Sequence, residues 1–236
     1  MNSVRTATGV LLKLVRYTVW AVIAFAVASV LLVVILRWAP PPTAGIIVQR
    51  QFEDSREGRL HYFVWTPWED MAPAVALAVI AAEDQRFFHH WGFDFDQLQR
   101  AIDESRRGGR LRGASTITQQ TAKNLFLWNG RSYLRKGLEA WFAVLIETLW
   151  PKQRILEVYL NIVEFGPEVY GINSASRRYF QKLPAQISPY EAALLAAVLP
   201  NPHVMHVNNP SAYVRERQGW ILGQMSQLGG ESLIQR

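Results

Sequence analysis

The longest apolar run of the chain lies near its N-terminus. Residues 17–36 read YTVWAVIAFAVASVLLVVIL, twenty residues without a charge or a proline. A helix of that length, rising 1.5 Å per residue, spans about 30 Å, the thickness of the hydrocarbon core of a bilayer. The run is longer than the apolar region of a cleaved signal peptide, and the stiff segment Pro40–Pro42 follows it. We therefore predict a retained transmembrane anchor over residues 17–38.

The charges that flank this run predict its orientation. Arg5, Lys13 and Arg16 precede it, and only Arg37 lies close behind. Positive charges near a membrane span favour the cytoplasmic side. The pattern therefore places residues 1–16 in the cytoplasm and the remainder of the chain on the outer, periplasmic side of the cytoplasmic (inner) membrane, in a single-pass protein.

Beyond the anchor, the apolar positions mostly follow the period of amphipathic helices. Residues 39–70 are the exception, because they have the composition of a linker with two short β-type runs at 46–48 and 61–65. From residue 71 onward, Ser, Gly and Pro bound several of the helical patterns. We expect helices at Met71–Ala82, Asp96–Arg107, Ser115–Leu127, Arg131–Leu149, Lys152–Ile162, Ile172–Phe180, Pro189–Leu199 and Arg215–Leu228. The sequence thus predicts a linker over 39–70 and a mainly α-helical domain over 71–236.

Composition excludes several classes of protein. Half of the residues are apolar, which is enough for a packed core and excludes disorder as the main state. The chain has no cysteine, so disulfides and cysteine-based metal or redox chemistry are excluded. Residues 1–38 carry +4 of the net charge of +6, which leaves only +2 for the rest, so we expect no nucleic-acid partner. His203 and His206 lack the context of a zinc motif, and we predict no metal site there.

Two carboxylates follow directly after the apolar helix predicted at 71–82. Glu83 and Asp84 open the stretch EDQRFFHHWGFD, which also contains His90. A carboxylate at the end of a buried helix is partly desolvated, which raises its pKa and suits it to proton transfer near neutral pH. Taken alone, the pair is more often a solvated helix end. The surrounding cluster of aromatic, imidazole and acidic groups favours a functional site.

A second polar stretch is a candidate for anion binding. Thr116, Gln120, Lys123 and Asn124 are spaced so that a helix puts them on one face, where they would form an array of donors for an oxyanion such as a phosphate. An ordinary capped helix start explains the same residues equally well.

The third stretch carries opposite charges one helical turn apart. Arg135, Lys136 and Glu139 lie on the polar side of an amphipathic helix. Such a pair is usually a surface ion pair of little energy, and the alternative is that it lines a groove.

These stretches, in their order, resemble the glycosyltransferase domain of the bacterial peptidoglycan polymerases, glycosyltransferase family 51. The resemblance covers roughly residues 72 to 210. Its five motifs are EDQRFFHHWGFD at Glu83–Asp94, GASTITQQTAKNLF at Gly113–Phe126, RKGLE at Arg135–Glu139, RILEVYLNIVEFG at Arg154–Gly166 and SPYEAALLAAVLPNP at Ser188–Pro202. The sequence ends soon after the fifth motif, which predicts the monofunctional type without a transpeptidase module.

The resemblance implies a fold and a reaction. The fold would be a lysozyme-like helical domain with a small second lobe, lying close to the membrane, with Phe93, Phe95, Phe126, Leu127 and Trp128 dipping into the interface. The reaction would join lipid II units into glycan strands by an inverting displacement that releases undecaprenyl pyrophosphate.

The resemblance also implies roles for individual residues. Glu83 would be the general base. Glu139 matches the second catalytic glutamate of the family, which would position Arg135 or Lys136 or help to organise the donor site. The departing pyrophosphate would meet Lys123 and Arg135. The remaining substrate-binding positions implied are Asp84, His90, Thr116, Gln120, Asn124 and Lys136.

The predicted partners follow from this reaction. They are lipid II, the growing glycan strand, the bilayer and other cell-wall synthesis or division proteins. We expect no tightly bound cofactor, although a divalent cation such as Mg²⁺ or Mn²⁺ at the pyrophosphate is compatible with the chemistry. Two alternatives remain open at this point: a lysozyme-like enzyme that cleaves peptidoglycan, and a non-catalytic, membrane-anchored partner of the cell-wall machinery.

Overall fold

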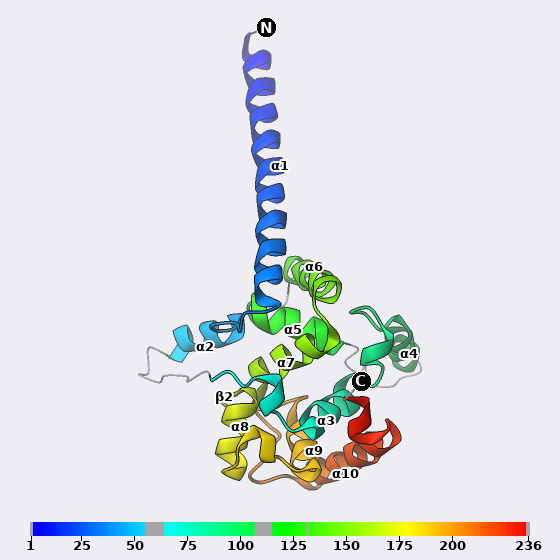
Figure 1. Cartoon of the computed structure of the whole chain (residues 1–236). Coiled ribbons are helices and arrows are strands. Elements are labelled where there is room, and N and C mark those ends of the chain that lie inside the picture. Colours follow the sequence, from blue (N-terminus) through cyan, green and yellow to red (C-terminus); the bar gives the residue numbers. More distant parts are fainter. Residues whose placement is uncertain (1, 55–63, 107–114, 131, 235–236) are drawn as a thin grey trace. The chain divides into compact units, whose positions relative to one another are not determined.

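The structure is a computed structural model that describes residues 2–54, 64–106, 115–130 and 132–234. Its contacts divide the chain into two units, Met1–Ala39 and Pro40–Arg236. The chain is mainly helical, as predicted, and Figure 1 shows the arrangement within each unit. The helices are α1 Asn2–Leu36, α2 Gly45–Asp54, α3 Pro73–Glu83, α4 Phe95–Arg106, α5 Ile117–Phe126, α6 Tyr133–Leu149, α7 Lys152–Ile162, α8 Gly171–Phe180, α9 Pro189–Val198 and α10 Ala212–Gln227, and the strands are β1 Glu164–Gly166 and β2 Val169–Tyr170.

The first unit consists mainly of helix α1. Its segment Leu11–Leu36 is 26 residues long with a mean hydropathy of 3.0, so it is long and apolar enough to cross a membrane. This agrees with the predicted anchor. The helix itself is longer than the apolar run, because residues from Asn2 onward are already helical.

The second unit is built around α3. Every residue from Ala74 to Ala81 is buried, so this helix has no polar face at all. Pro73 occupies its first turn, where a missing N–H costs nothing. Helices α9 and α10 pack against α3, while α5 packs against α6 and α7. The core therefore holds the C-terminal end of α3, and with it Glu83, in a fixed place.

The strands predicted in the linker are wrong where the structure describes them. Residues 46–48 lie in helix α2, not in a strand. Ile46 and Ile47 are buried, and α2 packs against α5, so tertiary packing overrides the β propensity of this short apolar run. Of the second predicted strand, 61–63 lies outside the described residues, and Val64 and Trp65 have no regular secondary structure.

The only strands in the described part of the chain were not predicted. β1 and β2 form a small antiparallel hairpin directly after α7. At its end Gly171 has a φ of +76°, and a Cβ there would lie 2.3 Å from the carbonyl oxygen of Asn161. Only glycine fits this position, which lets α8 begin immediately after the hairpin.

Several predicted helix ends shift by a few residues. Ser132 and Ser211 cap α6 and α10 with their side-chain oxygens, so α6 begins at Tyr133 and α10 at Ala212. Helix α4 ends at Arg106, and the predicted end at residue 107 lies outside the described residues, as do the first two residues of the second motif, 113–114.

Candidate active site

Glu83 is the last residue of α3, and its carboxylate has partners on two other helices. Oε2 accepts a hydrogen bond from Nε2 of Gln120 on α5 at 3.0 Å. Oε1 lies 3.6 Å from Nη2 of Arg217 on α10. Only 15% of the side chain is exposed. Burial raises the pKa of Glu83 above its ordinary value, and the Gln120 hydrogen bond and the Arg217 charge oppose that rise.

Gln120 is held in one orientation by a third helix. The hydroxyl of Tyr159 on α7 donates to its side-chain oxygen at 3.1 Å. Because that oxygen is occupied, the amide nitrogen points to Glu83. Tyr159 is fully buried, and burial raises its pKa well above the ordinary value, so its hydroxyl stays protonated as a donor. Gln120 is thus positioned to hold the Glu83 carboxylate.

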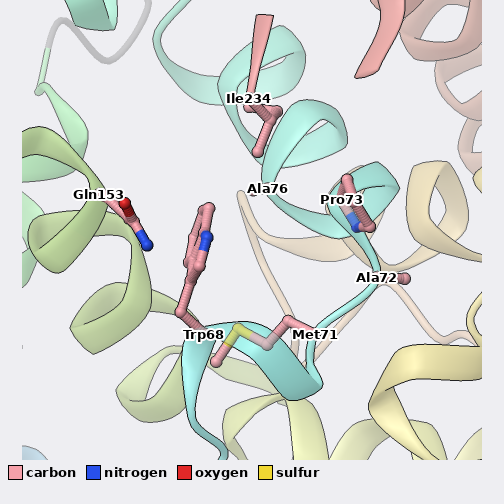
Figure 2. Close-up of a pocket in the computed structure, with 7 residues that line it drawn as sticks. All are labelled: Trp68, Met71, Ala72, Pro73, Ala76, Gln153 and Ile234. Carbon is pink, nitrogen blue, oxygen red and sulfur yellow. The ribbon is translucent and has the colours of Figure 1, made fainter. Parts of the chain in front are cut away.

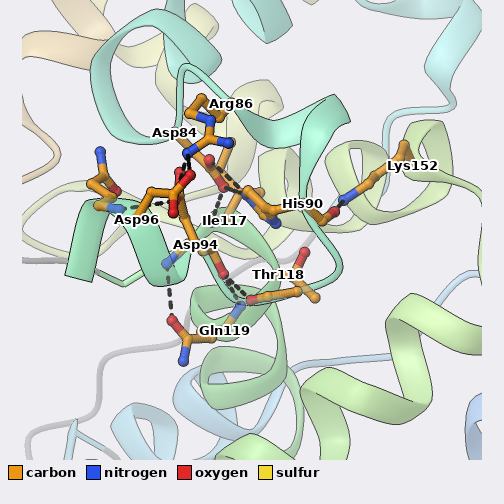
Figure 3. A network of polar contacts seen from close by, with 12 residues as sticks. Asp84, Arg86, His90, Asp94, Asp96, Ile117, Thr118, Gln119 and Lys152 are labelled. Carbon is orange, nitrogen blue, oxygen red and sulfur yellow. Dashed lines mark hydrogen bonds and ion pairs between the residues drawn. The ribbon is translucent and has the colours of Figure 1, made fainter. Parts of the chain in front are cut away.

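Asp84 and His90 form a buried pair beside the site (Figure 3). Asp84 is 1% exposed and His90 9%. The carboxylate of Asp84 lies 2.8 Å from Nε2 of His90 and accepts the backbone N–H of Ile117 at 3.0 Å. That these two residues bind substrate stays a prediction. Their side chains are occupied inside the protein, where they join the loop after α3 to the start of α5.

A second set of contacts fixes Gly92 in the same loop. Its N–H donates to Oε1 of Glu147 at 2.8 Å, and its carbonyl accepts the hydroxyl of Thr116 at 2.6 Å. Lys152 pairs with Glu147 and donates to the carbonyl of His90 at 2.8 Å. We call Gly92, Thr116, Glu147 and Lys152 the loop clamp. Glu147 and Lys152 belong to none of the stretches singled out as candidate chemistry in the sequence.

The ion pair of the loop clamp supplies a stability prediction. Lys152→Met should lower the free energy of unfolding by about 3 kcal/mol, the lower end of the range for a broken buried pair, because Glu147 is 2% exposed and loses its cation while Lys152 itself is 23% exposed. Chemical denaturation measures this loss. Lys182→Met is the matched control, since it breaks a Lys–Glu pair whose lysine is 40% exposed, and it should cost less than about 1 kcal/mol. Equal losses for the two variants would contradict the assignment.

The predicted donor face of α5 divides into exposed and buried members. Thr116 is fully buried, and its side chain caps α5 by accepting the N–H of Gln119. Asn124 is 6% exposed. That Thr116 and Asn124 bind substrate stays a prediction; the side-chain oxygen of Thr116 is used by the helix cap, whereas Oδ1 of Asn124 has no hydrogen-bond partner among the described residues. Gln120 and Lys123 are the partly exposed members of the set.

Lys123 belongs to a cluster of cations around Glu139. Nη1 of Arg135 lies 2.8 Å from the Glu139 carboxylate, and Lys136 contacts its other oxygen. Burial lowers the pKa of Lys123; the nearby Glu139 charge opposes this shift, while Arg135 and Lys136 add to it. Three cations thus surround one buried carboxylate, which leaves a net positive charge.

A cavity of about 410 Å³ opens beside this cluster. Lys123 and Arg135 line it together with Trp128, Asn129 and Gly130. Since α5 carries both Lys123 and Gln120, the partner of Glu83, the cavity lies about one helical turn along α5 from the residue that holds Glu83. The arrangement combines a buried carboxylate that can accept a proton with a cation-lined cavity that can bind an anion.

A second cavity, of about 270 Å³, lies elsewhere in the domain (Figure 2). It contains none of the predicted site residues. Its lining is mostly apolar: Trp68, Met71, Ala72, Pro73, Ala76, Gln153 and Ile234. It offers no carboxylate or cation for the chemistry considered above, so it is not the candidate active site.

Comparison with known proteins shows the family of the chain. A family model described as Transglycosylase matches residues 51–226. A biosynthetic peptidoglycan transglycosylase of Pseudomonas fluorescens Pf-5 is 52% identical over 95% of this chain and 92% of its own length. Proteins of the same name from Pseudomonas savastanoi pv. phaseolicola and P. fluorescens SBW25 are 50% and 53% identical over 96% and 89% of this chain, and over 95% and 88% of their own lengths. The chain therefore belongs to the transglycosylase family that includes the biosynthetic peptidoglycan transglycosylases.

Proposed function

We propose that this chain polymerises peptidoglycan glycan strands by joining lipid II units, with Glu83 as the general base. Family membership supports the polymerase reaction over the alternatives of a peptidoglycan-cleaving enzyme and a non-catalytic partner. The observation that carries the mechanism is the position of Glu83. It is a buried carboxylate hydrogen-bonded to Gln120, and Gln120 lies about one turn of α5 from Lys123, which lines the cation-lined cavity.

Glu83 takes the proton of the attacking hydroxyl. Oε2 accepts the hydrogen bond of Gln120, whereas Oε1 has only the more distant guanidinium of Arg217 at 3.6 Å, so Oε1 is the oxygen that we assign to the 4-hydroxyl of the acceptor's N-acetylglucosamine. That oxygen attacks C1 of the donor's N-acetylmuramic acid while the bond from C1 to the pyrophosphate breaks, and the anomeric centre inverts. The raised pKa of Glu83 brings its basicity closer to neutral pH, where a general base works best.

The leaving pyrophosphate gathers negative charge as the bond breaks. Lys123 and Arg135 line the cavity and supply positive charge there, and Lys136, whose side chain is 52% exposed, adds to it. Glu139 holds Arg135 and Lys136 through its two carboxylate oxygens. A cationic site arranged before the reaction stabilises developing charge without reorganising during the step.

The described residues form no preformed cage for a divalent cation, so such an ion would be held mainly by the pyrophosphate. Among residues 2–54, 64–106, 115–130 and 132–234, no three His, Asp or Glu side chains converge as ligands. Glu139, the buried carboxylate near the cavity, is already neutralised by two cations. We therefore derive no step through a metal ion.

Two aromatic side chains support contact with the membrane interface. Phe95 is 70% exposed and Trp128 46% exposed, and exposed aromatic rings favour the headgroup region. Leu127, which was predicted to dip into the interface with them, is 5% exposed, so that prediction is wrong. An interfacial site suits a substrate with a lipid chain.

The proposed orientation gives a topology prediction. A periplasm-active reporter, such as an alkaline phosphatase, fused after Arg236 should be active in cells, because the positive charges before the apolar run 17–36 keep the N-terminus in the cytoplasm. Activity of a cytoplasm-only reporter at the same position would contradict the orientation.

One assay separates the proposed function from both alternatives. Full-length protein in detergent micelles is given labelled lipid II, and the products are sized on a gel, in parallel with pre-made glycan. Long glycan from lipid II supports the proposal. Shortening of the pre-made glycan identifies a cleaving enzyme, and no change in either substrate identifies a non-catalytic partner.

A further inference from the structure

Arg217 is a charged residue beside Glu83 that no motif of the sequence indicated. It lies on α10, beyond the five motifs. Its Nη2 is 3.6 Å from Oε1 of Glu83, the carboxylate oxygen that Gln120 leaves free, and 3.4 Å from the carbonyl of Ala82, to which it donates. The side chain is 21% exposed. The guanidinium therefore lies against the end of α3 at the oxygen assigned to proton transfer.

The position of Arg217 is set by the packing of α10. Val214, Ile221 and Met225 are buried on one side of the helix. Gln218, next to Arg217, is also buried and donates to the carbonyl of Tyr190 at 2.8 Å, which fixes α10 against α9. An arginine on a helix anchored in this way holds its charge in one place.

The other groups around Glu83 do not supply a positive charge. Gln120 on α5 is neutral, and Tyr159 on α7 contacts Gln120 as a neutral hydroxyl. Asp84, the next residue in the chain, has a charge that opposes ionisation of Glu83, and it pairs with His90. Of the described side chains that shift the pKa of Glu83, only Arg217 is a cation.

We propose that Arg217 is a positioning residue that keeps the Glu83 carboxylate ionised and directs its Oε1 oxygen toward the acceptor hydroxyl. The inference rests on the proposed role of Glu83 as the base. Burial without a nearby cation favours the protonated carboxyl, and a protonated carboxyl cannot accept the proton of the acceptor. Arg217 thus opposes the rise in the pKa of Glu83 that burial causes.

Loss of the Arg217 charge should change the pH dependence of the rate in one direction. A cation beside a carboxylate lowers its pKa, so removing the charge of Arg217 raises the pKa of Glu83. The base works only when deprotonated, so activity is lost as the pH falls through that pKa. The acid limb of the rate profile should therefore move to higher pH, by about one unit for the loss of one close opposite charge.

The experiment measures kcat/KM for lipid II polymerisation from pH 5 to 9 with the full chain. We expect Arg217→Gln and Arg217→Met to shift the acid limb upward by about one unit and Arg217→Lys to keep it near the wild-type position. Two neutral variants are used so that poor folding of one leaves the other. Arg215→Gln is the matched control, because Arg215 is two residues away on α10 and contacts Tyr190 instead of Glu83. Its profile should match wild type.

Two results overturn the inference. One is a lower rate at every pH with an unmoved acid limb, which is what a merely structural role of Arg217 predicts. The other is an equal shift in Arg217→Lys, which retains the charge. Glu83→Gln is measured in parallel. If that variant polymerises normally, the proposed function of Glu83 fails, whereas an inactive Glu83→Gln with an unmoved limb in the neutral Arg217 variants refutes the role of Arg217 alone.

Discussion

Replacing Glu83 by glutamine is expected to slow glycan polymerisation by about 10²–10⁴-fold, the usual cost of losing a general base. Glutamine keeps the size of the side chain and its hydrogen-bonding reach, but it cannot accept the proton of the acceptor hydroxyl. Because neither sugar nor pyrophosphate binding depends on that proton, the loss should appear in kcat, with KM for lipid II nearly unchanged. Initial rates over a range of lipid II concentrations separate the two quantities.

The control for this variant is another glutamate on the same domain. Glu69→Gln makes the same chemical change at an exposed position away from the candidate site, and its rates should equal those of wild type. Near-normal polymerisation by Glu83→Gln would mean that another residue is the base, and the mechanism would then have to be abandoned even though the family assignment stands.

The second large effect is expected for Lys123→Ala, which removes a cation from the wall of the 410 Å³ cavity. The loss of one group that stabilises the departing charge costs on the order of 10²–10³ in rate. The pyrophosphate is already charged in the bound substrate, so binding should weaken too. Lys123→Ala should therefore lower kcat and raise KM, whereas Glu83→Gln changes kcat alone.

Lys182→Ala provides the comparison for Lys123→Ala. Lys182 pairs with Glu191 at the start of α9. The loss of Lys182 therefore removes a positive charge without changing the lining of the cavity. We expect unchanged kinetics. If Lys123→Ala lowered kcat with an unaltered KM, its ammonium would act only in the transition state. If it changed neither quantity, Lys123 would not bind the leaving group.

Local sequence correctly predicted that Glu83 lies at the end of a buried helix, but it predicted less well which residues around it are buried. The continuous apolar run before Glu83 predicts a buried helix, and a carboxylate at the end of such a helix is conspicuous. The spacing of Thr116, Gln120, Lys123 and Asn124 correctly predicts a helix, but periodicity does not tell which part of its face other helices cover. Thr116 with Gln119 is a capping box, a signal that could have assigned this hydroxyl to the helix start.

Long-range contacts explain most of what the sequence did not reveal. Arg217 is 134 residues from Glu83, and Glu147 is 55 from Gly92, so neither partnership leaves a local pattern. In the linker, the apolar residues at 46–48 suit a strand or a helix equally in isolation, and their burial against α5 decides for the helix.

The loop clamp has a consequence for hydrogen exchange. Both polar backbone groups of Gly92 are bonded to buried side chains from two different helices, Glu147 on α6 and Thr116 at the start of α5. Local opening exposes an amide only where a segment can separate from its surroundings at small cost. Opening the loop after α3 at Gly92 breaks both of these bonds and leaves the buried carboxylate of Glu147 without this N–H donor. The amide proton of Gly92 is therefore expected to exchange with solvent more slowly than amides of loop residues that lack such partners.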